Sequence, residues 1–148
     1  MTRRILHPTD FSAPSNAAFK KAIEMAKASR AELLIVHVIN PFVPVAGEGY
    51  VSPKVYEDLA ASTRAWARKQ LDRLLARARK SGVRGKGVLV EGAAHEQIAR
   101  IAKVRRADLV VMGTHGRSGF AKLFLGSVAG RVVAAAPCPV LTVKGRKP

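Results

Sequence analysis

The stretch VVMGTHGRSGFAKLFLGSVAGRVV, residues 110–133, joins a predicted strand to a predicted helix through a loop rich in glycine. Its first residues form an apolar, β-branched run typical of a buried strand, and its last residues form a run typical of a helix. Between them lie glycines at positions 113, 116, 119 and 126. Such a loop lies at the carboxyl end of a strand, which is where open α/β sheets bind ligands.

Apolar runs elsewhere in the chain predict the rest of the fold. We expect strands at 4–10, 31–40, 85–92, 107–113 and 138–143, with helices between the first two strands, from 53 to about 80, at 94–106 and from about 127 to 136. Five strands that alternate with four helices predict an α/β fold with an open five-stranded parallel sheet and helices on both faces. A length of 148 residues, 48% of them apolar, fits a single domain over 1–148.

Helical spacing indicates which side chains the first two helices bury. We expect Ser15 or Asn16 to cap the first helix, and Ser52 to cap the second just before Pro53. The predicted apolar stripes are Ala18, Ala22, Met25 and Ala26 in the first helix, and Val55, Leu59, Thr63, Trp66, Leu74 and Ala78 in the second.

The residues before the last helix predict an anion site. Gly126 and Ser127 stand at its start, where the N–H groups of Ser127 to Gly130, the positive end of the helix and a hydroxyl suit a phosphate. Gly113 and Gly116 would then lie near a sugar or the first phosphate, because glycine lets a ligand approach the backbone. The alternative is structural: Gly113 ends a strand, and Ser127 caps a helix.

This spacing excludes two familiar phosphate loops. No Gly-Lys-Ser/Thr ends the run, as a Walker A loop requires, and the glycines do not follow the Gly-x-Gly-x-x-Gly pattern of dinucleotide-binding folds. Without the lysine of such a loop and its paired acidic metal ligand, little is arranged for in-line hydrolysis. We therefore favour binding over catalysis and predict no catalytic residues.

The ends of the first two strands supply further candidates. Thr9 and Asp10 follow the first strand, where a carboxylate can accept from ribose hydroxyls or hold a metal-bound water. Asp10 could instead cap the segment FSAPSN. Val38 lies near the end of the second strand, where its backbone could pair with a purine edge, although a single valine is also typical of a core.

The segment GTHGRSGFAKLFLGS resembles the Gly-2x-Gly-9x-Gly-Ser/Thr nucleotide motif of the universal stress protein family. The similarity extends to RRILHPTDFS, AELLIVHVI and APCPVLTVK, and so covers nearly the whole chain. It implies a Rossmann-like fold of the adenine-nucleotide α-hydrolase kind and a nucleotide-dependent role in the stress response or in signalling. It also implies bound ATP or AMP, with room for Mg²⁺ or Mn²⁺ near the phosphates.

The resemblance assigns the nucleotide contacts residue by residue. They are Thr9, Asp10, Val38, Met112, Gly113, Gly116, Gly126, Ser127 and Val128. It further implies a homodimer through the last strand, Cys138 to Val143. An exposed apolar sheet edge there would otherwise stay uncovered.

The charge departs from what this resemblance leads us to expect. Lysine and arginine number 26 against 10 acidic residues, which gives a net charge of +16. Nine basic residues fall between positions 64 and 86, opposed there by Asp72 alone. One alternative is therefore a module that binds nucleic acid or another polyanion and keeps a vestigial nucleotide site; another is a slow ATPase. We favour a solvated basic surface, since few aromatic residues interleave the charges.

The remaining signals are weak. Cys138 is the only cysteine, so no intrachain disulfide can form, and the four histidines show no metal-ligand spacing, so no metal-ligating residues are predicted. His115 lies inside the proposed phosphate loop. The longest apolar run is short and interrupted by proline, and the amino terminus lacks a signal-peptide pattern, so we expect a cytoplasmic protein without a membrane anchor.

Overall fold

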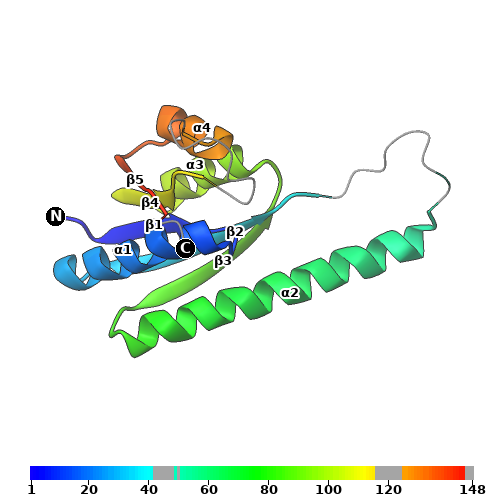
Figure 1. Ribbon diagram of the computed structural model, residues 1–148, viewed down its shortest axis with the longest axis horizontal. Coiled ribbons are helices and arrows are strands. Elements are labelled where there is room, and N and C mark those ends of the chain that lie inside the picture. The colour runs from blue at the N-terminus through cyan, green and yellow to red at the C-terminus, as the bar shows by residue number, and fades with distance from the viewer. Residues whose placement is uncertain (42–48, 50, 116–124, 146–148) are drawn as a thin grey trace.

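The computed structural model describes residues 1–41, 49, 51–115 and 125–145. Its strands are β1 (Arg4–Pro8), β2 (Glu32–Ile39), β3 (Gly85–Glu91), β4 (Leu109–Gly113) and β5 (Val140–Val143). They form one parallel sheet in the order β3-β2-β1-β4-β5. The predicted single-domain α/β fold with an open five-stranded parallel sheet is confirmed (Figure 1).

Helices cover both faces of this sheet. They are α1 (Ala13–Ser29), α2 (Pro53–Lys80), α3 (Ala94–Val104) and α4 (Ser127–Ala135). The first two pack on one face, and α3 and α4 pack on the other (Figure 1). The inner strands β1, β2 and β4 are almost continuously apolar and mostly buried, as expected for strands covered on both faces, whereas no residue of the edge strands β3 and β5 is fully buried. Among the described residues, no helix is both long and apolar enough to cross a bilayer.

The order in which the chain adds strands to the sheet reverses between β1 and β4, and there the two strands separate. They pair only through Ile5 with Leu109 and Leu6 with Val110. Pro8, at the end of β1, has no N–H to donate to a neighbouring strand. The carboxyl ends of β1 and β4 therefore leave space between them at the switch point, where ligands of open α/β sheets bind.

The first helix begins three or four residues earlier than predicted. Its cap is Ser12, whose hydroxyl accepts from the Ser15 N–H at 3.4 Å, so the expectation of Ser15 or Asn16 as the cap is wrong. Pro14 lies in the first turn, where the missing N–H costs nothing. The predicted stripe is otherwise present, since Ala18, Ala22 and Ala26 are buried, while Met25 is half-buried.

The second helix buries less than its apolar spacing predicted. Leu59 and Trp66 are 50% and 45% exposed, Val55 and Thr63 are exposed too, and the buried side chains are Ala67, Leu71, Leu75 and Ala78. A helix of 28 residues is about 42 Å long, whereas the eight residues of β2 extend about 26 Å. Only the carboxyl-terminal half of α2 can therefore lie on the sheet, and the other half extends past it (Figure 1).

A small residue in β3 lets this half of α2 approach closely. A Cβ placed on Gly87 would lie 2.9 Å from a Leu71 methyl carbon. Glycine at this position therefore allows the helix to sit directly on the edge strand.

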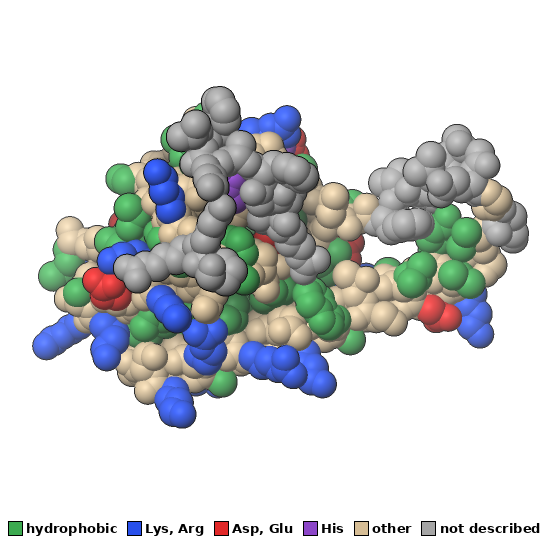
Figure 2. Space-filling model, viewed as in Figure 1, with side chains coloured by type: hydrophobic (Ala, Val, Ile, Leu, Met, Phe, Trp, Pro, Cys, Tyr) green, Lys and Arg blue, Asp and Glu red, His purple; other side chains and the backbone are tan. Residues whose placement is uncertain are grey.

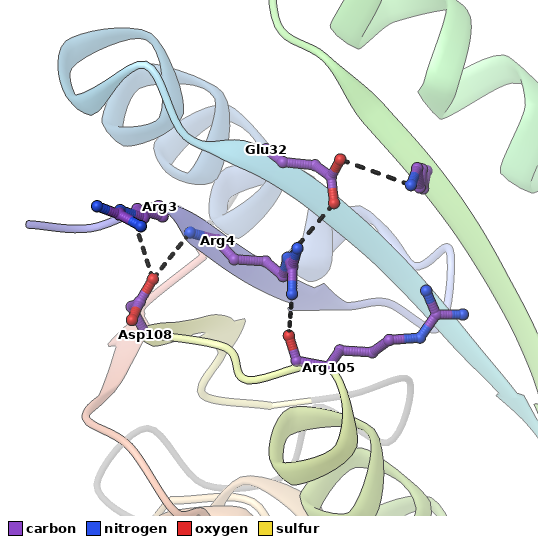
Figure 3. Close-up of polar contacts among 6 residues, drawn as sticks. Arg3, Arg4, Glu32, Arg105 and Asp108 are labelled. Carbon is purple, nitrogen blue, oxygen red and sulfur yellow. Dashed lines mark hydrogen bonds and ion pairs between the residues drawn. The ribbon is translucent and has the colours of Figure 1, made fainter.

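Polar groups join the amino-terminal ends of the strands, opposite the switch point (Figure 3). The Asp108 carboxylate accepts from the backbone N–H groups of Arg3 and Arg4 at 2.8 and 3.0 Å, which holds the pKa of Asp108 below its usual value. The Arg4 guanidinium also donates to the Arg105 carbonyl and pairs with Glu32 at 3.5 Å. These contacts fix the strand ends that lie farthest from the proposed site.

A buried histidine joins β1 to β4 behind the switch point. The His7 ring is fully buried, and its Nδ1 lies 2.9 Å from the Val111 carbonyl oxygen, so Nδ1 carries the proton and donates. The opposite nitrogen, Nε2, is buried without a hydrogen-bond partner among the described residues. Burial lowers the pKa of His7 to about 4, because a second ring proton would bring an unpaired charge into the core.

Candidate functional site

A cavity of about 580 Å³ lies at the carboxyl ends of β1, β2 and β4 and reaches the start of α4. This volume falls within the usual range for small-molecule sites. Every predicted site residue that the structure describes lines it: Thr9, Asp10, Val38, Met112, Gly113, Gly126, Ser127 and Val128. Gly116 lies outside the described residues. Residues far apart in the sequence thus meet at one cavity.

One end of the cavity is apolar. Val36 and Val38 from β2 face Ile98 from α3, and Ala94 adds the first turn of that helix. Sequence reasoning placed Val38 there but missed Val36, Ala94 and Ile98. The only sequence signal for these three residues was helical spacing, which places Ile98 with Ile101 and Ala102 on the inward face of the third predicted helix. A flat ring could lie between these side chains with little need for hydrogen bonds beyond the exposed backbone.

The other end is formed by the start of α4. No side chain of the described residues caps this helix, whose amino-terminal cap is Gly126. The Gly130 N–H donates to the Gly126 carbonyl at 2.9 Å, so the range of unpaired N–H groups predicted from the sequence is too long by one. The N–H groups of Ser127, Val128 and Ala129 belong to the first turn, where an α-helix provides no internal acceptor.

Gly126 is required by the protein itself. Its N–H donates to the Thr114 carbonyl at 2.7 Å, and a Cβ on Gly126 would lie 2.8 Å from that same oxygen. Any side chain at 126 would therefore push the start of α4 away from the end of β4. At Gly113, by contrast, a Cβ would meet neighbouring backbone atoms at 3.5 Å or more, which is ordinary van der Waals contact. The described protein atoms thus explain glycine at 126 and leave it unexplained at 113.

The loop after β1 is held by its own side chains. One Asp10 carboxylate oxygen accepts from the Ser12 N–H at 2.9 Å, as the structural alternative for this residue proposed. The Thr9 and Ser15 hydroxyl oxygens lie 3.1 Å apart in a buried pair. His37 reaches over from β2, with Nδ1 2.8 Å from the Thr9 carbonyl oxygen. Asp10 is thereby held at the cavity wall in a defined position.

His115 is a further polar side chain at this wall. Its Nδ1 lies 3.0 Å from the Thr114 hydroxyl oxygen, and its Nε2 is buried with no hydrogen-bond partner among the described residues. The described residues bring no three His, Cys, Asp or Glu side chains together as a metal site. The cavity therefore combines an apolar end, one carboxylate and a helix start without a capping side chain.

Comparison with known proteins identifies the family. The model of the universal stress protein family matches residues 1–144. Universal stress protein MJ0531 of Methanocaldococcus jannaschii is 37% identical over 147 residues, which cover 98% of this chain and 84% of that protein. The chain belongs to the universal stress protein family.

Solved structures agree with this assignment. Hypothetical protein MJ0577, from the same organism, superposes with a TM-score of 0.85 at 28% identity, over 100% of this chain and 99% of its own. A universal stress protein solved in complex with cAMP superposes with a TM-score of 0.73 at 26% identity, over 98% of each chain. The fold of this chain is thus the fold of the family.

Proposed function

We propose that this chain binds an adenine nucleotide, ATP or AMP, and acts as a nucleotide-dependent module in the stress response or in signalling. The observation that carries the proposal is the meeting of the uncapped α4 start with the ends of β1 and β2 in one cavity. The family relative solved with cAMP supports an adenine nucleotide as the ligand class. Nucleotide bound in this cavity would alter the surface that other proteins recognise.

The cavity suggests a direction for the ligand. The adenine would lie at the apolar end beside Val38 and Ile98, with the ribose near Asp10. The phosphates would reach the first-turn N–H groups at Ser127 and Val128, where the helix dipole favours negative charge. This orientation uses both ends of the cavity, and a ligand without phosphate would leave the α4 start unused.

A divalent ion fits only as part of the nucleotide complex. Asp10 is the one carboxylate among the described lining residues, and one of its oxygens already accepts from Ser12. Mg²⁺ or Mn²⁺ would therefore be held mainly by phosphate oxygens and water, as Mg²⁺ commonly is in nucleotide sites. Its chemistry would be to neutralise phosphate charge. The described lining holds no lysine or arginine that would stabilise in-line transfer, which favours binding over hydrolysis.

The last strand suggests how two copies would associate. β5 is an edge of the sheet, and Leu141 on it is 36% exposed. Unpaired edge strands attract other strands, so we propose a homodimer through residues 138–143. The carbonyls of Pro139 and Val143 accept from β4, which leaves the N–H and C=O groups of Val140 and Thr142 directed outward.

Native mass spectrometry of the protein as purified tests the ligand class. We expect a fraction of the protein to carry an additional mass equal to ATP, ADP or AMP, and addition of ATP to saturate the remainder. Addition of GTP at the same concentration serves as the comparison for the base. A protein that takes up neither nucleotide would overturn the proposal, and equal uptake of both would remove the adenine assignment.

A further inference from the structure

A second cavity, of about 400 Å³, lies between α1 and α2 on the face of the sheet opposite α3 and α4. Phe11 and Leu74 form apolar parts of its wall, and Arg73 and Arg77 from α2 supply positive charge. We propose that this cavity binds a small organic anion with a phosphate or carboxylate head and an apolar or aromatic body. The proposal does not rest on the nucleotide site.

The charge at this cavity is unbalanced. None of its described lining residues is acidic, and neither Arg73 nor Arg77 forms an ion pair with a described carboxylate. The two arginines lie one turn apart on the same helix, where like charges repel each other. Basic side chains also project along α2 and α1 at the lower edge of the visible face (Figure 2). An anion between the two guanidinium groups would relieve this repulsion.

One of these groups is already held in place. The Arg77 guanidinium carbon lies 4.6 Å from the centroid of the Phe19 ring, and its NH1 donates to the Asn16 side-chain oxygen at 3.2 Å. Stacking on a ring face and a fixed hydrogen bond reduce the conformational freedom that binding would otherwise remove. A planar guanidinium also matches the paired oxygens of a phosphate or carboxylate. Arg77 is therefore exposed but held in place, where an anionic group can reach it.

The apolar wall argues for a ligand that is more than an inorganic ion. Phe11 has a left-handed backbone with φ of 63°, a strained conformation for a residue with a bulky side chain. Its ring packs on His37 at 4.4 Å and edge-on against Trp66 at 5.5 Å, measured between ring centroids. Both Phe11 and Leu74 remain half-buried beside the arginines. A hydrocarbon or aromatic body would cover this surface while its anionic head meets the guanidinium groups.

The two cavities are adjacent but can be tested separately. Thr9 and Ser15 line both of them. The second cavity is otherwise bounded by α1 and α2, whereas the α4 start belongs to the first alone. A ligand in the second cavity should perturb the backbone amides of residues 16–19 and 70–77, whereas a ligand in the first should perturb those of 126–129. Amides next to Thr9 and Ser15 should respond to either ligand.

Phenyl phosphate is the probe, with inorganic phosphate and phenol for comparison. Titration at constant ionic strength, followed by amide chemical shifts, should shift the signals of residues 16–19 and 70–77. Inorganic phosphate should bind at least about fivefold more weakly, and phenol should not bind detectably, because the cavity uses charge and apolar contact together. Shifts confined to 126–129 would place the ligand in the first cavity and overturn the proposal.

Matched arginine variants separate the cavity from general attraction by a basic protein. The double variant Arg73→Gln with Arg77→Gln should weaken phenyl phosphate binding at least about tenfold. Arg68→Gln with Arg79→Gln changes the charge of the same helix equally but lies outside the cavity, and should weaken binding less than about twofold. The single variant Arg73→Gln covers the case in which the double variant fails to fold because Arg77 has lost its contacts. Arg73 is exposed, and its replacement alone should weaken binding about threefold or more. Equal effects of the two double variants would overturn the proposal.

Discussion

Acid should destabilise this protein through His7 in particular. The pKa of His7 is about 4 in the folded protein, against an ordinary value of 6.5. Because the folded-state pKa is the lower of the two, the unfolded chain takes up the proton first as the pH falls. The stability contribution is therefore present above pH 6.5 and is lost progressively between pH 6.5 and 4.

The size of the effect follows from the pKa difference. Each pKa unit of difference corresponds to about 1.36 kcal/mol. Acidification from pH 7 to 4.5 should therefore lower the unfolding free energy by about 2 to 3 kcal/mol through His7. That is a large share of the stability of a typical domain. Urea unfolding at each pH measures the loss directly.

His7→Asn is the matched variant. Its side-chain amide can donate to the Val111 carbonyl in place of Nδ1, but it does not titrate in this range. The variant should be less stable at neutral pH because the smaller side chain leaves a cavity. Between pH 7 and 4.5, however, its unfolding free energy should fall by about 2 to 3 kcal/mol less than that of the native protein. Parallel pH curves for the two proteins would refute the reasoning, since His7 would then contribute nothing to acid sensitivity.

Three further predictions concern glycine, the sheet edge and charge. Gly126→Ala should lower the unfolding free energy, measured in urea, by about 1 to 3 kcal/mol, because its Cβ meets a backbone oxygen at 2.8 Å. Gly130→Ala, whose Cβ has its nearest contact at 3.9 Å, should raise the unfolding free energy by up to about 1 kcal/mol. The reverse order of stabilities would contradict the steric account. Thr142→Pro should shift sedimentation from dimer to monomer without unfolding the chain, and an unchanged dimer would place the interface elsewhere. Despite the nine basic residues between 64 and 86, random-sequence DNA should bind only weakly at physiological salt, and sub-micromolar binding there would favour a polyanion module.

Much of the fold could be predicted because the inner strands β1, β2 and β4 are buried on both faces. Their apolar runs, separated by helical segments, predict a parallel sheet without any knowledge of long-range contacts. The length of α2 and the position of its stop at Ser81 were also predictable. The sequence spacing of α2 could not show what lies opposite each turn of the helix. Leu59 and Trp66 continue its apolar stripe and yet are 50% and 45% exposed.

The cavity could be predicted in outline but not in detail. Gly126 and Ser127 were found from a local pattern, because a helix start after glycine is visible in sequence. The reason why residue 126 is glycine could not be found from sequence, because it depends on the Thr114 carbonyl, which the fold brings close to residue 126. Ile98 and the cavity beside Arg73 depend likewise on how separate helices pack. The cap of α1 was predicted at Ser15 or Asn16, and the structure has Ser12 instead.

Calorimetric titration of ATP and AMP into the native protein and into Ser127→Asp tests the central claim most directly. The aspartate lies at an exposed helix start, where negative charge favours the helix, so folding should be preserved while phosphate is repelled. Ser127→Ala, which removes only a hydroxyl, should weaken ATP binding by about 1 to 2 kcal/mol. We predict that the native protein binds ATP, that Ser127→Ala binds it more weakly, and that Ser127→Asp shows no detectable binding. ATP affinity unchanged by Ser127→Asp would contradict the placement of the phosphates at the start of α4.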